Sequence, residues 1–448
     1  MAEAPKLTEI SVQGLLGRFN HTIKFPPDQE FVIVYGPNGI GKTRLLELIS
    51  NTFALKMGEV SRTPFTQALF SFNDGARLTL ENITPLVSDE HNEYEYTLRL
   101  LLEQAGGESI EWVNTREQAD LRDIPMSRWA RLIERYTPIR YAGGGRFTDH
   151  ETGRTLSRAE VIDRYGYVIP PELIPFPQFP EGIKDFLKGA DVHLIETQRL
   201  LTNGKPQQDP RGEPSSRITV QKFSEDFSRR MHEALAQNSR TSQELDRTFP
   251  RRLLSAGHPP AAATEEAIRA RYDEQSQLRD RLAEISLLQG SSDLPLPNKK
   301  LDPSQRLVLW TYLDDSERKL ATFEDLLRRV QLFRDIVNSR FQFKQLRLNR
   351  GGFSFVTDLG QEIPAESLSS GEQHELVLAY DLLFNVAENS LVLIDEPEIS
   401  LHVAWQQEFL NDIAKIANTA SLRFIVATHS PQIIHKWRSR AVSLGVDD

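Results

Sequence analysis

Several features are missing from this sequence, and each absence excludes a class of protein. The 448 residues include no cysteine, which excludes disulfide bonds and zinc sites built on thiolates. No stretch of about 18 consecutive apolar residues occurs, so no segment is predicted to cross a membrane as a helix. Residues 1–6 lack the apolar core of a secretory signal. We therefore expect a soluble protein of the cytoplasm.

An excess of positive charge is also missing. The net charge is −10, with 26% charged and 39% hydrophobic residues, which is typical of a soluble globular protein. This balance argues against broad, non-specific binding to DNA, although a local basic surface remains compatible with it. The length exceeds what one compact core usually holds, so we expect two or three structural units.

Residues 36–43 form the most informative stretch that is present. They read Gly-Pro-Asn-Gly-Ile-Gly-Lys-Thr, which matches the phosphate-binding loop pattern. An apolar, β-branched run at 31–35 predicts a buried strand before the loop, and residues 44–49 predict a helix after it. Backbone N–H groups of such a loop and the start of its helix bind phosphate. The residues expected to contact ATP are Gly36, Asn38, Gly39, Gly41, Lys42 and Thr43.

Two of these residues have side chains with a specific role. The ammonium group of Lys42 is suited to the β- and γ-phosphates, and the hydroxyl of Thr43 is suited to binding Mg²⁺. A chance match in a glycine-containing turn is the alternative, and the strand and helix on either side argue against it. The pattern therefore predicts a site for ATP and Mg²⁺.

Two later strands end in polar residues that fit the same chemistry. The apolar run 390–394 is followed by Asp395 and Glu396, and the run 422–427 leads to His429. A carboxylate at a strand end beside a phosphate loop can hold Mg²⁺ through water, which we assign to Asp395. Glu396 can polarise the attacking water. His429 can hydrogen-bond to the γ-phosphate, so we predict Glu396 and His429 to be catalytic.

A second anion site is predicted where residues 367–373, Ser-Leu-Ser-Ser-Gly-Glu-Gln, open a helix at about 375–383. Ser369 and Gly371 would present a hydroxyl and a free N–H group there. This site would have no ligand within one subunit. It makes sense if it covers ATP that is held by another subunit, so we expect a homodimer or a larger homo-oligomer.

Gln198 follows another predicted buried strand at 191–196. A glutamine just beyond a strand could reach Mg²⁺ and the attacking water, which would make it both a metal ligand and a catalytic residue. It could equally be an ordinary polar residue at the end of a strand. The local sequence leaves both interpretations open.

The rest of the chain suggests how the molecule is organised. Residues 65–115 alternate like antiparallel strands, and 216–340 carry the apolar spacing of helices, interrupted at 290–303. We interpret the helical part as a hairpin with two arms of about 25 residues. Glycines 143–145 are read as a surface loop in preference to a second phosphate loop. The basic pairs 251–252 and 299–300 could meet DNA or lie in solvent.

Taken together, the motifs resemble those of ATP-binding-cassette (ABC) ATPases of the structural-maintenance-of-chromosomes (SMC) and RecF type. Residues 36–43 match the first phosphate motif of that group, residues 391–396 the second, and residues 368–373 the signature. The signature departs by having Ser370 for the first Gly and Glu372 ahead of the Gln. Residues 398–402 resemble the dimer-contacting loop and His429 the switch histidine, and the resemblance favours Gln198 as the family glutamine.

The resemblance implies an α/β fold that is a split ABC ATPase head. It implies a phosphate-loop α/β core and an antiparallel β subdomain, interrupted by a helical or coiled-coil hairpin insert. The expected boundaries are 1–215 for the N-terminal part of the head, 216–340 for the insert and 341–448 for the C-terminal part.

Within this group, residues 395–402 and 427–431 are similar to the overcoming-lysogenization-defect ATPases and the ATPase subunits of PARIS- and Septu-type anti-phage systems. Only 19 residues follow His429, too few for a nuclease domain. The resemblance then implies a sensor or scaffold ATPase with a separate effector nuclease of Toprim or HNH type and a phage-derived trigger. The alternatives are a DNA-repair ATPase that binds DNA directly and a scaffold that binds ATP but hardly hydrolyses it.

Overall fold

The computed structural model describes residues 5–26, 29–83, 97–113, 126–150, 154–157, 161, 165, 179–196, 215–288, 295–399 and 401–445. The chain forms two compact units. The first consists of Met1–Thr197, Ala387–Ile399 and Gln406–Asp448, and the second of Gln198–Val386 and Ser400–Trp405. The chain therefore leaves the first unit and returns to it, and each unit is described by itself.

A parallel sheet is the part of the first unit that positions the candidate site. Its strand order is β11-β15-β16-β3-β17, and all four pairings are parallel. The strands are β11 (Val192–Glu196), β15 (Leu391–Asp395), β16 (Arg423–Thr428), β3 (Phe31–Tyr35) and β17 (Ala441–Ser443). Because the pairings are parallel, the carboxyl ends of these strands meet at one edge, where ligands of α/β sheets bind.

A six-stranded antiparallel sheet also belongs to this unit, with the order β2-β1-β4-β5-β6-β7. Its strands are β1 (Leu7–Leu15), β2 (Phe19–Lys24), β4 (Gln67–Phe72), β5 (Arg77–Ile83), β6 (Thr97–Glu103) and β7 (Ser109–Val113). Alternating burial along β2 and β4 matches one packed and one solvated face. The antiparallel strands predicted at 65–115 are confirmed for β4 to β7.

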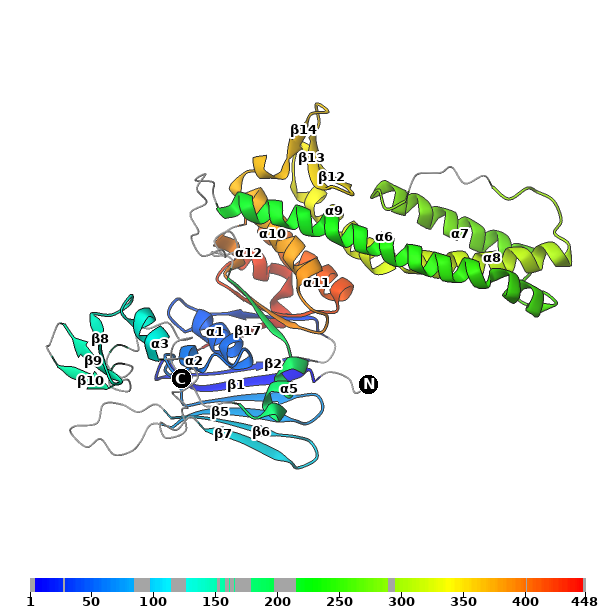
Figure 1. The fold of residues 1–448 in the computed structure, drawn as a ribbon. Helices are drawn as coiled ribbons and strands as arrows, with labels where there is room; N and C mark the ends of the chain where they lie inside the picture. The colour runs from blue at the N-terminus through cyan, green and yellow to red at the C-terminus, as the bar shows by residue number, and fades with distance from the viewer. Residues whose placement is uncertain are drawn as a thin grey trace. The chain divides into compact units, whose positions relative to one another are not determined.

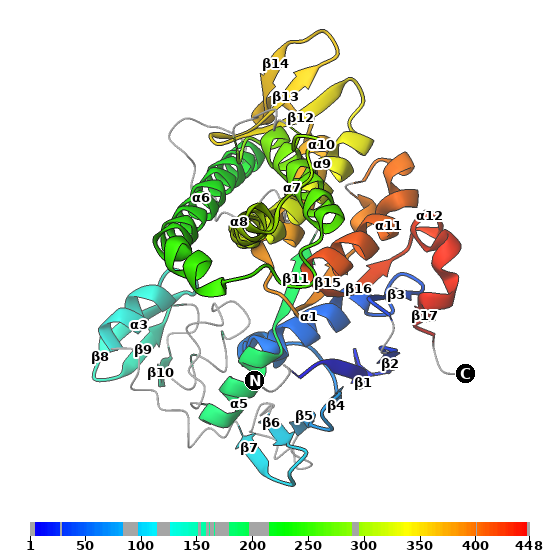
Figure 2. The same ribbon diagram turned by 90° about the vertical axis from the view of Figure 1, so that its right-hand side faces the viewer.

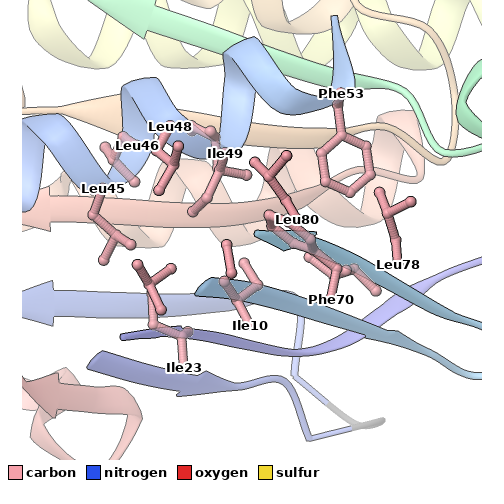
Figure 3. Packing of buried hydrophobic residues seen from close by; sticks show 14 of the residues in the cluster. Ile10, Ile23, Leu45, Leu46, Leu48, Ile49, Phe53, Phe70, Leu78 and Leu80 are labelled. Atoms are coloured by element: carbon pink, nitrogen blue, oxygen red, sulfur yellow. The ribbon is translucent and has the colours of Figure 1, made fainter. Parts of the chain in front are cut away.

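Helix α1 (Lys42–Phe53) follows the phosphate loop and supplies much of the core. Leu45, Leu48, Ile49 and Phe53 are buried on it at helical spacing. They belong to one apolar cluster with residues of the antiparallel sheet, and Figure 3 shows α1 side chains directed toward Phe70 and its neighbours. The beginning of α1 is thus held by burial of its own later turns.

A small subdomain lies at residues 126–165. It contains α3 (Met126–Ile133) and a three-stranded sheet of order β10-β9-β8, coloured cyan in Figure 1. The strands are β8 (Ile139–Gly143), β9 (Arg146–Asp149) and β10 (Thr155–Ser157). Trp129, Ile139 and Phe147 are fully buried in a separate apolar cluster, so this subdomain has its own core. Outside this subdomain, the described part of the first unit also contains α2 (Met57–Val60), α5 (Glu181–Gly189), η4 (Pro397–Ile399), α12 (Pro431–Ile434) and η5 (His435–Arg440). Helix α11 (Val403–Ala420) belongs to the first unit from Gln406 onward.

The second unit is mainly helical. Its long helices are α6 (Ser215–Ala256), α7 (Glu265–Glu284), α8 (Pro303–Ala321) and α9 (Glu324–Arg340). Helix α8 contacts both α6 and α7, and Figure 2 shows the three side by side. The sequence predicted two arms, whereas the described residues of this stretch form four helices. The 42 residues of α6 span about 60 Å. Gly257 and the prolines at 259–260 separate α6 from α7.

The rest of the second unit carries the signature. A hairpin of β12 (Lys344–Asn349) and β13 (Gly352–Thr357) is extended by β14 (Glu362–Pro364), followed by η2 (Ala365–Ser367), α10 (Ser370–Tyr380) and the π-helical η3 (Asp381–Asn385). Among all the described residues, no helix combines the length and apolar character needed to cross a membrane.

Candidate functional site

The phosphate loop connects β3 to α1 at the carboxyl edge of the parallel sheet. Gly39 and Gly41 have φ values of 84° and 91°, which side chains with a Cβ rarely adopt. A Cβ at Gly36 would lie 2.6 Å from the carbonyl oxygen of Leu444. The glycines are therefore required both by backbone conformation and by close packing, and Gly41 caps the start of α1.

Lys42 is buried and turned back over the loop. Its Nζ donates to the carbonyl oxygens of Gly36 at 3.0 Å and Pro37 at 3.2 Å. Burial lowers the pKa of Lys42, although the carboxylates of Glu396, Asp395 and Glu398 oppose this effect. The ammonium group is thus already held above the loop in which the sequence predicts phosphate binding.

Thr43 and Asp395 come together as the sequence predicts for a magnesium site. Thr43 Oγ1 donates to Asp395 Oδ2 at 2.8 Å, across 352 positions of sequence. Burial raises the pKa of Asp395 to about 6; the hydrogen bond from Thr43 opposes the rise, and Glu396 adds to it. A hydroxyl and a carboxylate are hard oxygen ligands that suit Mg²⁺. Among the residues that the structure describes, no group of three or more His, Asp or Glu side chains could hold a metal, so water and phosphate oxygens would complete the coordination.

His429 lies between Lys42 and Glu396. Lys42 Nζ is 3.3 Å from His429 Nδ1, and His429 Nε2 is 3.6 Å from Glu396 Oε1. Because an ammonium group can only donate, Nδ1 accepts, and a neutral His429 carries its proton on Nε2. That proton faces the region of Glu396. The structure therefore brings together the residues predicted to bind the phosphate, to sense it and to polarise water.

Glu396 has an unusual backbone conformation. Its φ of 46° is in the left-handed region, which costs a residue with a side chain about 1 kcal/mol or more. Its N–H donates to the carbonyl oxygen of Ala427 on β16 at 2.9 Å. The strain is thus maintained by the neighbouring strand, as is common where a side chain must be placed for function.

Glu398 is a residue whose importance sequence reasoning missed, because it was assigned only to the dimer-contacting loop. Its Oε1 accepts from the N–H groups of His429 at 2.6 Å and Ser430 at 3.0 Å, and its Oε2 accepts from Thr428 Oγ1 at 2.8 Å. Gln406 donates to the Glu398 carbonyl oxygen. Glu398 therefore fixes the end of β16 and, through it, the position of His429.

The predicted second anion site lies at the start of α10 in the second unit. Ser369 caps the helix, and its side chain and N–H group both contact Glu372 in a capping box. Lys344 Nζ holds the same carboxylate at 2.8 and 2.9 Å. Ser369 is exposed, and nothing lies within 4 Å of the position of a Cβ at Gly371. Glu372, where the signature departs from the family pattern, thus stabilises the turn.

The pKa of Glu372 is lowered: burial acts to raise it, but the hydrogen bonds from Lys344 and Ser369 outweigh that effect. Gln373 supports the same turn by donating to the carbonyl oxygens of Glu366 and Leu368, each at 3.0 Å. Gln198, predicted to reach the metal and the water, lies outside the described residues, and its role stays a prediction.

Comparison with known proteins identifies a family for more than half of the chain. Residues 186–435 match a family model described as "AAA domain, putative AbiEii toxin, Type IV TA system". The chain is 26% identical over 207 residues to a protein named "Retron Ec83 probable ATPase" of Escherichia coli, covering 40% of this chain and 37% of that protein. It is also 30% identical over 161 residues to the spermidine/putrescine import ATP-binding protein PotA of Mesomycoplasma hyopneumoniae, covering 35% of each.

Among solved structures, the chain aligns with the SMC head domain of Pyrococcus furiosus, which has an extended coiled coil and is bound to the C-terminal domain of ScpA. The alignment covers 99% of this chain and 94% of that chain, with 14% identity and a TM-score of 0.35. The SMC head domain of Thermotoga maritima aligns at 11% identity and a TM-score of 0.31, over 97% of this chain and 92% of that one. The chain spans little more than a third of the curated relatives named above. Because the family model covers more than half of the 448 residues, the chain belongs to this AAA-domain family.

Proposed function

We propose that ATP hydrolysis takes place at the cluster of Lys42, His429 and Glu396, with the ATP phosphates bound by residues 36–43. The observation that carries this proposal is the pair of contacts that His429 makes, 3.3 Å to Lys42 and 3.6 Å to Glu396. They join the end of β16 and the residue after β15 to the phosphate loop. Three predicted roles thereby meet at one edge of one sheet.

Each residue of the cluster has a distinct role. The Lys42 ammonium exchanges its bonds with the carbonyl oxygens of Gly36 and Pro37 for bonds to phosphate oxygens. Glu396 accepts a proton from the attacking water. His429 donates from Nε2 to the γ-phosphate and so responds to its presence. Thr43 and Asp395 would hold Mg²⁺, which when bound neutralises charge on the phosphates.

A second copy of the chain completes this site. Ser369 and Gly371 present their polar groups at the start of an 11-residue helix, and Ser369 is exposed. A helix start suits a γ-phosphate, and the Ser369 hydroxyl and N–H group would exchange their bonds to Glu372 for bonds to phosphate oxygens. ATP is therefore bound between the phosphate loop of one copy and the signature of another.

The biological role we propose is that of the sensor or scaffold ATPase in a bacterial anti-phage system with a separate effector nuclease. The motifs at 395–402 and 427–431 support it, as does the similarity to the ATPase of a retron and to a family named for a toxin–antitoxin protein. The nucleotide state controls the effector, and a phage-derived trigger changes that state. Such a switch requires that the ATP-bound and ATP-free forms differ in affinity for effector or trigger.

The test is to tag the chain in its native operon and identify the proteins that co-purify with and without ATP. A nuclease that co-purifies, with an amount that depends on nucleotide, is the expected result. Phage plating should show protection by the complete operon and none by this gene alone. Nuclease activity of the isolated chain, or protection by this gene alone, would contradict a two-component system.

A further inference from the structure

The small subdomain at residues 126–165 is basic in a chain that is acidic. Its described residues 126–150 and 154–157 hold six arginines and no lysine against two acidic residues, a net charge of 6 − 2 = +4. The whole chain has a net charge of −10. The arginines are Arg128, Arg131, Arg135, Arg140, Arg146 and Arg154. A local basic patch of this kind is the electrostatic footprint of a polyanion-binding surface.

Strand register places two of these arginines on one face of the β8–β10 sheet. Arg140 pairs with Thr148, which in turn pairs with Thr155, and Arg146 lies two residues before Thr148 on β9. Side chains two apart on a strand share a face, so these four residues form one surface, called here the arginine face. Arg140, Arg146 and Thr155 are exposed. The opposite face carries the buried Ile139, Phe147 and Leu156 of the subdomain core.

The two acidic residues that the structure describes in the subdomain do not pair with this surface. Asp149 is fully buried and accepts a hydrogen bond from the Tyr165 hydroxyl at 2.9 Å. Glu134 accepts from the backbone N–H of Tyr141 at 3.0 Å. Within the described part of the chain, neither Arg140 nor Arg146 forms an ion pair with a carboxylate. Arg140 Nη1 donates to the backbone carbonyl oxygens of Glu134 and Ile139, each at 3.1 Å, which occupies one nitrogen of its guanidinium group. Both arginines are exposed, so an anionic ligand can reach them.

Arginines of the helical unit behave differently. Arg252, which the sequence suggested as a DNA contact, holds the buried Asp315 with two hydrogen bonds of 2.5 and 2.6 Å. Arg271 and Arg329 are also paired with carboxylates. Those arginines stabilise helix packing through ion pairs, whereas Arg140 and Arg146 pair with no carboxylate of the described residues.

We propose that the arginine face binds the sugar-phosphate backbone of single-stranded nucleic acid. Guanidinium groups match phosphate oxygens with two parallel hydrogen bonds, and threonine hydroxyls add further donors. Tyr136, which precedes β8, is 44% exposed. Tyr141, 37% exposed, pairs with Phe147 and lies on the face opposite the arginine face. Exposed aromatic rings stack on unpaired bases and not on bases inside a duplex.

The tip of the β8–β9 hairpin supports close approach of a ligand. Gly143 and Gly144 have positive φ values of 90° and 59°, and nothing lies within 4 Å of where their Cβ atoms would be. The loop predicted to lie at the surface thus leaves the ends of both strands open. This binding surface involves neither the ATP site nor an effector. An experiment that contradicts it would therefore leave the proposed function untouched, and the reverse also holds.

The test is fluorescence anisotropy with a fluorescein-labelled 30-nucleotide single-stranded DNA, an RNA of the same sequence and the DNA duplex. We expect the full-length protein to bind a single strand more tightly than the duplex. Comparing the single-stranded DNA with the RNA shows which of the two sugar-phosphate backbones the protein prefers. The double variant R140E/R146E should bind about tenfold or more weakly. Each phosphate contact on a single strand contributes about 0.7 to the steepness with which the logarithm of the binding constant falls with the logarithm of salt concentration. Loss of two contacts should therefore reduce this steepness by about 1.4.

Two further variants separate this face from general electrostatics. K299E/K300E changes the net charge equally at two exposed lysines of the helical unit and should bind as wild type does. R140K/R146K keeps the charge and should retain the salt slope while losing part of the affinity. Circular dichroism and ATPase activity equal to wild type establish that each variant is folded. The proposal would be overturned if K299E/K300E weakened binding equally or if R140E/R146E left binding unchanged. It would also be overturned if the protein preferred the duplex, or if it bound phosphatidylserine vesicles but not oligonucleotides.

Discussion

At the scale of single residues, Glu396 combines a reactive position with a strained backbone. Its φ of 46° is tolerated because β16 fixes its N–H, so the carboxylate is directed by the sheet and not by its own rotamer preference. Its Oε1 lies 3.6 Å from His429 Nε2. This distance is too long for a hydrogen bond, so the carboxylate lies close to His429 without being fixed by it.

Replacing Glu396 by Gln should preserve ATP binding and slow hydrolysis by about 100-fold or more. The amide keeps the shape of the side chain but cannot accept the proton of the attacking water. Phosphate release under single-turnover conditions measures the rate, and a fluorescent ATP analogue measures binding. Glu108→Gln, at an exposed turn between β6 and β7, is the matched control. Wild-type hydrolysis by the Glu396 variant would remove this residue from the mechanism.

Asp395 makes the stability of the nucleotide-free protein depend on pH. Its pKa is raised from 3.8 to about 6, chiefly by burial. A raised pKa means that the folded state holds the proton more tightly than the unfolded state. The associated stability is fully present below about pH 4 and is lost as pH rises through 6. Asp395→Asn should abolish that loss.

The expected change is modest, because Asp395 is only partly buried and solvent screens its charge. Between pH 5 and pH 8, the free energy of unfolding of the variant relative to wild type should increase by about 1 kcal/mol. Urea denaturation without nucleotide or Mg²⁺ measures it at both pH values. Asp358→Asn, at an exposed aspartate, should show no such trend. A relative stability that falls with pH would reverse the assigned sign.

At the scale of elements, the sequence predicted the parts of the site that follow directly from a strand. Asp395, His429 and the phosphate loop each come at the end of an apolar run, and parallel pairing brings such ends together. Glu398 could not be assigned in this way. Its role arises from bonds to Thr428, His429 and Ser430, about 30 positions away, and no local pattern indicates them.

The same limit applies to the second unit. Lys344 and Glu372 are 28 positions apart, one on a strand and the other on a helix. The apolar periodicity of the sequence does not specify how these two elements pack together. The four-helix arrangement was simplified to two arms for a similar reason. The apolar spacing within α7 and α9 predicts helices, but it does not tell whether the chain continues or breaks between two helical stretches. The sequence does contain a signal for the break after α6, at Gly257 and the prolines that follow.

Glu398→Gln should reduce both stability and hydrolysis. The amide retains one acceptor oxygen but loses the charge that two N–H groups and a hydroxyl share, and such bonds contribute about 1.5 to 3 kcal/mol together with the desolvation of the groups left unpaired. We expect the free energy of unfolding to fall by about 1 to 2 kcal/mol. His429 would then be displaced, and the rate of hydrolysis would fall with it.

The contrast with Glu396→Gln is what makes this variant informative. A residue that acts through His429 should alter the melting temperature and the rate together, whereas a residue that acts on water should alter the rate alone. Thermal denaturation and steady-state ATPase assays on both variants compare the two patterns. An unchanged melting temperature for Glu398→Gln would show that its hydrogen bonds do not hold the end of β16.

At the scale of the whole molecule, the residues predicted to bind one ATP are divided between two compact units. Lys42, Asp395 and His429 belong to the first, and Ser369 and Gly371 belong to the second. Each set is ordered by contacts within its own unit: the first by the parallel sheet, the second by the capping box and Lys344. Each set thus takes its local geometry from its own unit, as a site assembled from two copies of the chain requires.

A complementation experiment tests this arrangement. Lys42→Ala removes the charge that binds the phosphates, and Ser369→Arg places a bulky cation at the start of α10, so each variant alone should lack ATPase activity. Mixed dimers contain one intact site, formed by the phosphate loop of the Ser369 variant and the signature of the Lys42 variant. Co-expression with two different tags and tandem purification isolates these mixed dimers.

We expect the mixed dimers to recover roughly half of the wild-type activity. Dimers that carry both substitutions on one chain provide the matched control. If hydrolysis required both motifs from one chain, the first mixture would be inactive, whereas dimers pairing the doubly substituted chain with wild type would retain one working site.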